Sequence, residues 1–164
     1  MSKPKKTLHT VNTRFQYNNK ILSKSTDARI YRDCVLMSVG EWTDSMSRTP
    51  ITYTREALSK YASNWKENYL NVDHSFETRN RLGFVTNPYF KDDKVYGNLT
   101  IFPITTVAKD IIALIDADLV NWLSVELLSD DNWSEDNKKI FADNITFIGA
   151  AVVLYPASDG TTIK

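Results

Sequence analysis

The segment NWLSVELL, residues 121–128, constrains the fold most, because apolar and polar side chains alternate in it with the two-residue period of a β-strand. Leu123 and Val125 fall on one face of such a strand and predict a face that packs in a core. Ser124 and Glu126 fall together on the other face. A buried hydroxyl without a partner costs about 1–3 kcal/mol, and a buried carboxylate without one costs more. This second face is therefore expected to be hydrated or to supply partners for both groups.

Further strand and helix patterns predict a mostly β chain of one domain. Its 164 residues favour a single domain with a real core. Strand patterns occur at 30–42 and 144–157, a hairpin pattern spans 81–102, and apolar residues at helical spacing predict helices at 54–69 and 105–119. Because the strands do not alternate regularly with helices, a doubly wound parallel sheet is disfavoured. We expect an α+β fold with a closed or half-closed, mostly antiparallel sheet and packed helices.

The composition changes along the chain and divides it into three regions. Residues 1–28 are polar and are expected to form an N-terminal arm or leader, residues 29–158 the globular domain, and residues 159–164 a tail. The N-terminus has lysines but no apolar stretch typical of a secretory signal, and the apolar runs fall far short of the roughly 18 residues of a membrane span. We therefore expect a cytoplasmic protein without a membrane partner.

Charge and residue counts exclude several kinds of site. Lys and Arg together number 20, as do Asp and Glu, which argues against a basic surface for nucleic acid. Cys34, the single cysteine, has apolar neighbours and is expected to be a buried structural thiol. The acidic segment 129–139 lacks the spacing of a calcium loop, and two histidines with one cysteine form no zinc pattern. No metal or cofactor site is expected.

Ser124 and His74 are the side chains that together suggest chemistry. His74 ends an extended segment, YLNVDHS, and is one of only two histidines. A serine hydroxyl becomes a useful nucleophile when an imidazole accepts its proton and a third group orients that imidazole. A lone histidine more often lies at a surface, and a strand serine more often bonds the backbone, so the pairing is a hypothesis. It predicts the Ser124 hydroxyl within hydrogen-bond reach of a His74 ring nitrogen, with a looser contact allowed in an unliganded state.

The order of short motifs resembles the capsid maturation proteases, or prohead proteases, of tailed viruses, which are related to the herpesvirus assemblins. The motifs are DHS, RLGFV, VYGNLTIF, a helix, WLSVEL and FIGAAVVLYPA, over about residues 35–158. Their order and spacing carry the specificity. The resemblance implies a herpesvirus-protease-like fold, a small and mostly antiparallel β-barrel with packed helices. It also implies a serine endopeptidase that needs no cofactor, with Ser124 as the nucleophile and His74 as the general base.

The same resemblance implies partners and a location. The substrates would be the scaffold protein, the N-terminal region of the major capsid protein and the protease itself. Cleavage would take place inside the procapsid, in the host cytoplasm. The herpesvirus relatives dimerise, so a homo-oligomer is an open alternative, whereas no membrane and no specific nucleic acid is implied.

Gly149 departs from the family pattern. Members often place an acidic residue near this position, or a histidine in the herpesvirus relatives, and a glycine has no side chain to orient an imidazole. Glu126 is the first expected substitute because it shares a strand face with Ser124, and Asp143 and Asp73 follow. The alternatives are a dyad, an inactive scaffold or capsid-associated module of the same fold, and a small barrel that binds nucleic acid through aromatics.

Overall fold

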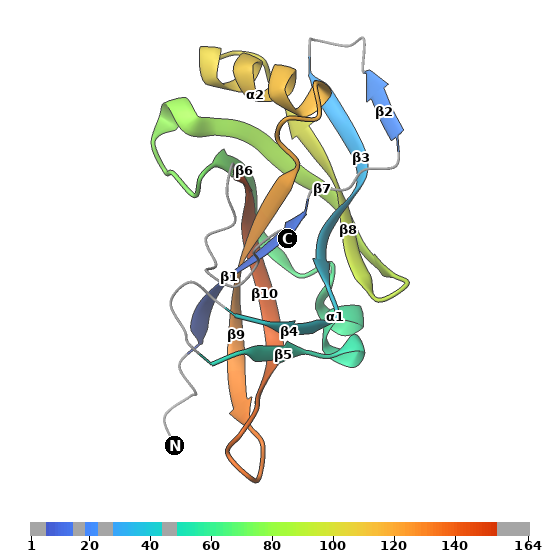
Figure 1. Cartoon of the computed structure of the whole chain (residues 1–164), viewed down its shortest axis with the longest axis vertical. Coiled ribbons are helices and arrows are strands. Elements are labelled where there is room, and N and C mark those ends of the chain that lie inside the picture. Colours follow the sequence, from blue (N-terminus) through green and yellow to red (C-terminus); the bar gives the residue numbers. More distant parts are fainter. Residues whose placement is uncertain (1–5, 15–18, 23–27, 44–48, 154–164) are drawn as a thin grey trace.

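The structure, a computed structural model, describes residues 6–14, 19–22, 28–43 and 49–153. Within them the chain forms a mostly β fold with two short α-helices (Figure 1). The strands are β1 (Thr7–Arg14), β2 (Asn19–Leu22), β3 (Arg29–Ser38), β4 (Gly40–Trp42), β5 (Ile51–Tyr53), β6 (Trp65–Val72), β7 (Arg81–Lys91), β8 (Lys94–Ile101), β9 (Trp122–Trp133) and β10 (Ile140–Val153). The helices are α1 (Arg55–Tyr61) and α2 (Thr106–Asp116), and Thr78–Asn80 form a single 3₁₀ turn.

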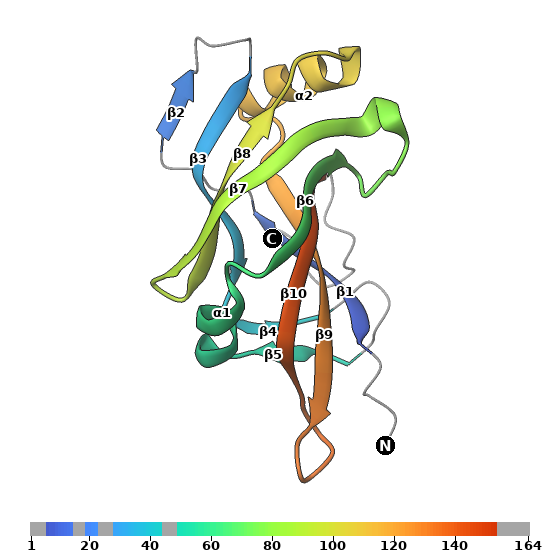
Figure 2. The same ribbon diagram turned by 180° about the vertical axis from the view of Figure 1, so that it is seen from behind.

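One sheet contains the long strands, in the order β1-β9-β10-β6-β7-β8-β3-β2. Most neighbours are antiparallel, as expected, but β10 runs parallel to both β6 and β5, so the sheet is mixed. The β9–β10 hairpin forms its longest ribbon (Figures 1 and 2). The parallel β10–β6 pair matters for the site, because it brings the end of β6 alongside the open end of the hairpin, where β9 begins and β10 ends.

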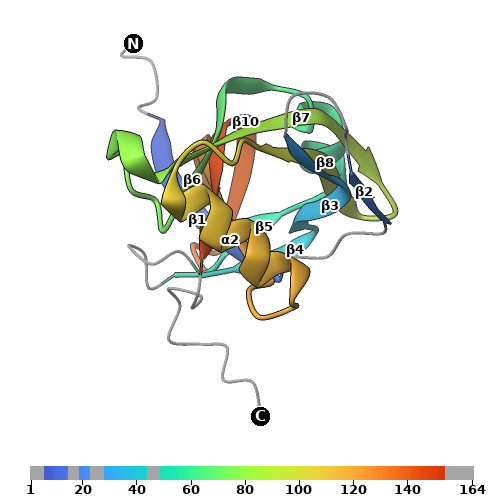
Figure 3. The ribbon, with the colours of Figure 1, turned by 90° about the horizontal axis from the view of Figure 1, so that it is seen from above.

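The sheet curls into a half-barrel, and the strands form a ring when viewed from above, with α2 lying across one end (Figure 3). Helix α1 packs near β10 at the other end (Figure 2). Leu123, Val125 and Leu127 of β9 are fully buried in the core, which confirms the apolar face predicted for this strand. No helix in the described ranges is long and apolar enough to cross a membrane.

The second predicted helix and the predicted hairpin are confirmed, whereas the first helix was predicted too long. Helix α1 ends at Tyr61, and Asn64 N closes a turn on Tyr61 O at 2.9 Å. From Trp65 the chain is a strand that pairs with β10 on one side and β7 on the other. This ladder of backbone hydrogen bonds, formed with distant segments, overrides the helical spacing of apolar residues that continues into β6.

Part of the predicted N-terminal arm belongs to the sheet. Strand β1 pairs antiparallel with β9 over its whole length, and β2 pairs with β3, so the boundary at residue 28 does not separate an arm from the domain. The predicted tail, 159–164, lies outside the described residues. The acidic segment 129–139 is partly strand, because β9 continues to Trp133. Cys34 is buried, as predicted, and burial raises the pKa of its thiol.

Candidate active site

Two rows of residues cross β9, β10 and β6 and carry the candidate site. Direct cross-strand neighbours point to the same face of a sheet, and residues two apart on one strand share that face. The face opposite the apolar core side of β9 therefore carries both rows. The first, here the serine row, is Ser124, Ala151 and Asn71, and the second, the glutamate row, is Glu126, Gly149 and Tyr69.

His74 reaches this face from a tight turn that follows β6. Asp73 N donates to Val152 O at 3.1 Å, and Ser75 N donates to Val72 O at 2.8 Å, which closes the turn. Asp73 and His74 both have positive φ, 47° and 57°, as the two central residues of a type I′ turn do. Non-glycine residues in this region cost about 1–3 kcal/mol each, and such backbone strain is concentrated at functional sites.

Glu126 joins His74 to the strand face. His74 Nδ1 lies 2.5 Å from Glu126 Oε1, and the Tyr69 hydroxyl donates to Glu126 Oε2. Burial of the 7% exposed Glu126 would raise the pKa of its carboxyl, but the hydrogen bonds from His74 and Tyr69, with the charge of His74, lower it below the ordinary value. Glu126 is therefore ionised at neutral pH. Since a carboxylate only accepts hydrogen bonds, the Nδ1 atom of His74 carries a proton.

No hydrogen bond joins Ser124 and His74 in the structure, which contains no bound substrate. Ser124 is fully buried, and neither its Oγ nor the buried Nε2 of His74 has a hydrogen-bond partner in the described part of the chain. Ser124 and Glu126 are two residues apart on β9, which corresponds to about 7 Å along the strand. The structure thus pairs His74 with one polar residue of this face and leaves the other polar residue, Ser124, unpaired.

Comparison with solved structures shows where this architecture occurs elsewhere. The chain is similar to the bacteriophage T4 capsid assembly protease, gp21, with a TM-score of 0.62, 11% sequence identity, and coverage of 91% of this chain and 99% of that one. The two proteins share a fold. No family model and no curated protein sequence matches the chain. The fold shared with gp21 thus agrees with the resemblance to prohead proteases seen in the motifs.

Gly149 faces a side chain that explains why no acidic residue stands there. A Cβ atom at this position would lie 2.4 Å from Cε2 and 2.5 Å from Cδ2 of Tyr69. The Tyr69 ring thus fills the space that any larger side chain at position 149 would need. The carboxylate that contacts the imidazole comes from β9, through Glu126, and not from β10.

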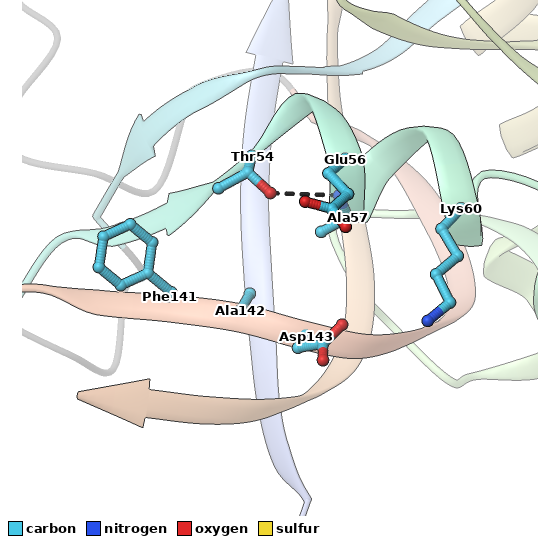
Figure 4. Close-up of a pocket in the computed structure, with 7 residues that line it drawn as sticks. All are labelled: Thr54, Glu56, Ala57, Lys60, Phe141, Ala142 and Asp143. Atoms are coloured by element: carbon cyan, nitrogen blue, oxygen red, sulfur yellow. Dashed lines mark hydrogen bonds between the residues drawn. The ribbon is translucent and has the colours of Figure 1, made fainter. Parts of the chain in front are cut away.

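The two other acidic candidates lie away from the imidazole. Asp73 is exposed in the turn, and no hydrogen bond joins it or Asp143 to His74 within the described residues. Asp143 lies near the far end of β10, eight residues before Ala151, which corresponds to about 25 Å along a strand. There it lines a shallow pocket between α1 and β10 together with Glu56 and Lys60 (Figure 4).

Tyr69, Asn71 and Gly149 belong to these rows but were not predicted as site residues. Tyr69 and Asn71 are two apart, the spacing that places them on one face of a strand. Tyr69 was assigned to the end of the helix predicted at 54–69, so the face that it shares with Asn71 of the extended segment YLNVDHS was missed. Arg81, across from β6, places its guanidinium 5.2 Å from the centre of the Tyr69 ring. In the described residues, no group of three His, Cys, Asp or Glu side chains is arranged to hold a metal ion.

Proposed function

We propose that this protein is a serine endopeptidase of virus capsid assembly, a prohead protease of the herpesvirus-protease-like lineage. The observation that carries the proposal is the His74–Glu126 pair, held on the same strand face as Ser124. The fold shared with the T4 capsid assembly protease supports it. The proposed substrates are the scaffold protein, the N-terminal region of the major capsid protein and the protease itself, inside the procapsid in the host cytoplasm.

Each of the three side chains has a role in the proposed reaction. His74 Nε2 accepts the Ser124 proton while Oγ forms a bond to the scissile carbonyl carbon and the carbonyl electron pair moves to oxygen. Collapse of this tetrahedral intermediate breaks the C–N bond, and the imidazolium returns the proton to the leaving amine. Water then hydrolyses the acyl-enzyme by the same route. Glu126 fixes Nδ1 as the protonated nitrogen and stabilises the imidazolium that forms.

The protonation states inferred from the hydrogen bonds of Glu126 are compatible with these roles. The lowered pKa of Glu126 keeps it charged at neutral pH, so it can offset the positive charge on His74. Its second oxygen is held by Tyr69, whose own pKa is raised by burial and by the hydrogen bond to Glu126, so the phenol stays a donor. With Nδ1 protonated, Nε2 is the basic nitrogen of a neutral His74, and it has no hydrogen-bond partner in the described residues.

The strand pairing restricts how a substrate reaches Ser124. The backbone of β9 is paired with β1 on one side and β10 on the other at this position, so a substrate cannot add to β9 as a further strand. It has to approach across the sheet face. Since Ser124 is fully buried, productive binding also requires a local opening that uncovers the hydroxyl and brings it to Nε2.

Co-expression of this chain with the scaffold and capsid proteins of its virus tests the proposal. Ser124→Ala and His74→Ala should each lower the cleavage rate by roughly 10⁴- to 10⁶-fold, so that no cleavage is detected. The chain offers matched controls: Ser129→Ala removes a second buried hydroxyl of β9, which bonds Asp131, and His9→Ala removes the other histidine. Both controls should keep cleavage wherever thermal unfolding shows that they fold.

The assigned roles would be contradicted if Ser129→Ala lost as much cleavage activity as Ser124→Ala, or His9→Ala as much as His74→Ala. Absence of cleavage with the wild-type chain, under conditions where it still associates with scaffold or capsid protein, would instead favour an inactive capsid-associated module. The missing Ser124–His74 hydrogen bond and the burial of Ser124 favour that second candidate. The nucleic-acid-binding alternative predicts salt-dependent binding to oligonucleotides, and the balanced charge argues against it.

A further inference from the structure

Asn71 is a buried amide without a hydrogen-bond partner, at the end of the serine row. It is 1% exposed, and neither Nδ2 nor Oδ1 is hydrogen-bonded to any described residue. Ala151 alone stands between it and Ser124 in the row, and a methyl group offers no hydrogen bond. Three unpaired polar groups therefore gather at this site, on Asn71, Ser124 and His74.

A buried amide without a partner among the described residues is costly unless another group forms hydrogen bonds with it. Leaving a buried donor or acceptor unpaired costs about 1–3 kcal/mol, whereas an apolar residue of the same shape would cost nothing of that kind. The neighbouring row shows the contrast, because Tyr69 and Glu126 satisfy each other there. The unpaired amide is thus explained if a ligand of the site, and not the protein, provides its partner.

The spacing of the row suits a peptide carbonyl. Strands in a sheet lie about 4.8 Å apart, so the Cα atoms of Asn71 and Ser124, two strands apart, are separated by about 10 Å. The side chains of Asn71 and Ser124 lie on the same face of the sheet, one at each end of this separation of about 10 Å (two strand spacings). A carbonyl carbon attacked by Ser124 Oγ can direct its oxygen toward β6, where an amide N–H can donate to it at about 2.9 Å.

We propose that Asn71 is a further catalytic residue, whose Nδ2–H donates to the oxygen of the scissile carbonyl and stabilises the oxyanion of the tetrahedral intermediate. The inference rests on the proposed function and adds a donor to it. The amide supplies no proton and exchanges no electrons; it binds the negative charge that Ser124 attack places on that oxygen. Oδ1 is then the acceptor available to a backbone N–H of the same bound peptide.

Two substitutions at Asn71 separate catalysis from stability. Asn71→Leu removes the donor at similar volume, and Asn71→Asp keeps the shape but places a carboxylate where the oxyanion forms. Each should lower kcat about 10²- to 10³-fold with KM changed only a few-fold, the size of effect seen when one oxyanion donor is lost. Because the amide has no partner among the described residues, Asn71→Leu should also leave the melting temperature unchanged or raise it.

Asn98 provides the matched control. It is another buried asparagine, 8% exposed, but its Oδ1 accepts a hydrogen bond from Asp33 N at 3.0 Å. Asn98→Leu should therefore lower the melting temperature and leave kcat unchanged in the folded fraction, the opposite pattern to Asn71→Leu. Both are measured with the full chain, on a peptide that carries the mapped cleavage site.

Two results would overturn this inference while leaving the proposed function intact. One is a kcat for Asn71→Leu close to that of the wild type, when Ser124→Ala is inactive. The other is a fall in melting temperature as large as that of Asn98→Leu, which would mean that the amide has a structural partner. If the wild-type chain itself cleaves nothing, the proposed function fails, and the role of Asn71 fails with it.

Discussion

Glu126 uses both of its carboxylate oxygens, one for His74 and one for Tyr69, whereas Ser124 on the same face uses none of its hydrogen-bonding capacity within the described residues. A buried charge has to be paired, so the carboxylate is locked in place. A buried hydroxyl without a hydrogen-bond partner lowers the stability of the fold by about 1–3 kcal/mol, which is less than a buried unpaired charge would cost. At the residue scale the site is therefore arranged around Glu126, whereas Ser124 Oγ has no hydrogen-bond partner among the described residues.

Gly149→Ala tests whether the Tyr69 ring depends on the glycine. The added Cβ would meet the ring at 2.4 Å, so the ring has to move and the Tyr69–Glu126 hydrogen bond is lost. We expect a loss of about 1–3 kcal/mol in the free energy of unfolding, as for other overpacked sites. The measurement is urea unfolding of Gly149→Ala in the wild-type background and in a Tyr69→Ala background.

The second background isolates the contact. With the ring removed, Gly149→Ala should cost much less, and the difference between the two costs is the coupling energy of positions 69 and 149. Equal costs in the two backgrounds would show that the Tyr69 ring does not require the glycine.

The sequence predicted three of the site residues and could not predict the others, for a physical reason. Glu126 was identified because period-two alternation fixes which side chains share a strand face. Its partner Tyr69, and Asn71, lie on β6, where residues 69–75 were predicted to be extended. The pairing of β6 with β10 and β7 decides which of its side chains lie beside Glu126. The extended pattern of one segment does not reveal which strands pair with it.

At the scale of elements, β1 covers one edge of β9 by pairing with it. Its register places Val11 opposite Val125 and Asn12 opposite Ser124, so the strand that carries the proposed nucleophile is not an open edge. His9 Nε2 lies 2.9 Å from Asp131 Oδ1, a contact that ties β1 to the end of β9. A polar composition predicted an arm here, because β1 has few apolar residues and only the ladder with β9 orders it.

Val11→Ala and Leu8→Ala test whether β1 packs as a structural strand. Val11 is 2% exposed and belongs to the core, whereas Leu8 on the same strand is 47% exposed. Truncating Val11 should lower the free energy of unfolding by about 1–3 kcal/mol, while truncating Leu8 should change it by less than about 0.5 kcal/mol. Chemical unfolding of the two variants measures this directly. Equal and small effects would mean that β1 does not pack against the core in solution.

At the scale of the whole molecule, the buried carboxylate of Glu126 makes the folding stability depend on pH. The hydrogen bonds from His74 and Tyr69 lower the folded pKa of Glu126 below its ordinary value of 4.5, despite the opposing effect of burial. A group whose pKa is lower in the folded state binds protons more readily when unfolded. Its contribution to stability is therefore complete above about pH 4.5 and is lost as the pH falls through the folded pKa.

Glu126→Gln separates this contribution from those of the other acidic residues, which remain in both chains and cancel in the difference. The glutamine keeps the size of the side chain but carries no charge at any pH. The wild type should be more stable than Glu126→Gln at pH 7, and this advantage should shrink steadily as the pH falls from about 4.5 to 3, because protonation makes Glu126 neutral as well. Urea unfolding of both proteins across this range measures the difference. A difference that stays constant down to pH 3 would show that Glu126 is not held as a carboxylate by His74 and Tyr69.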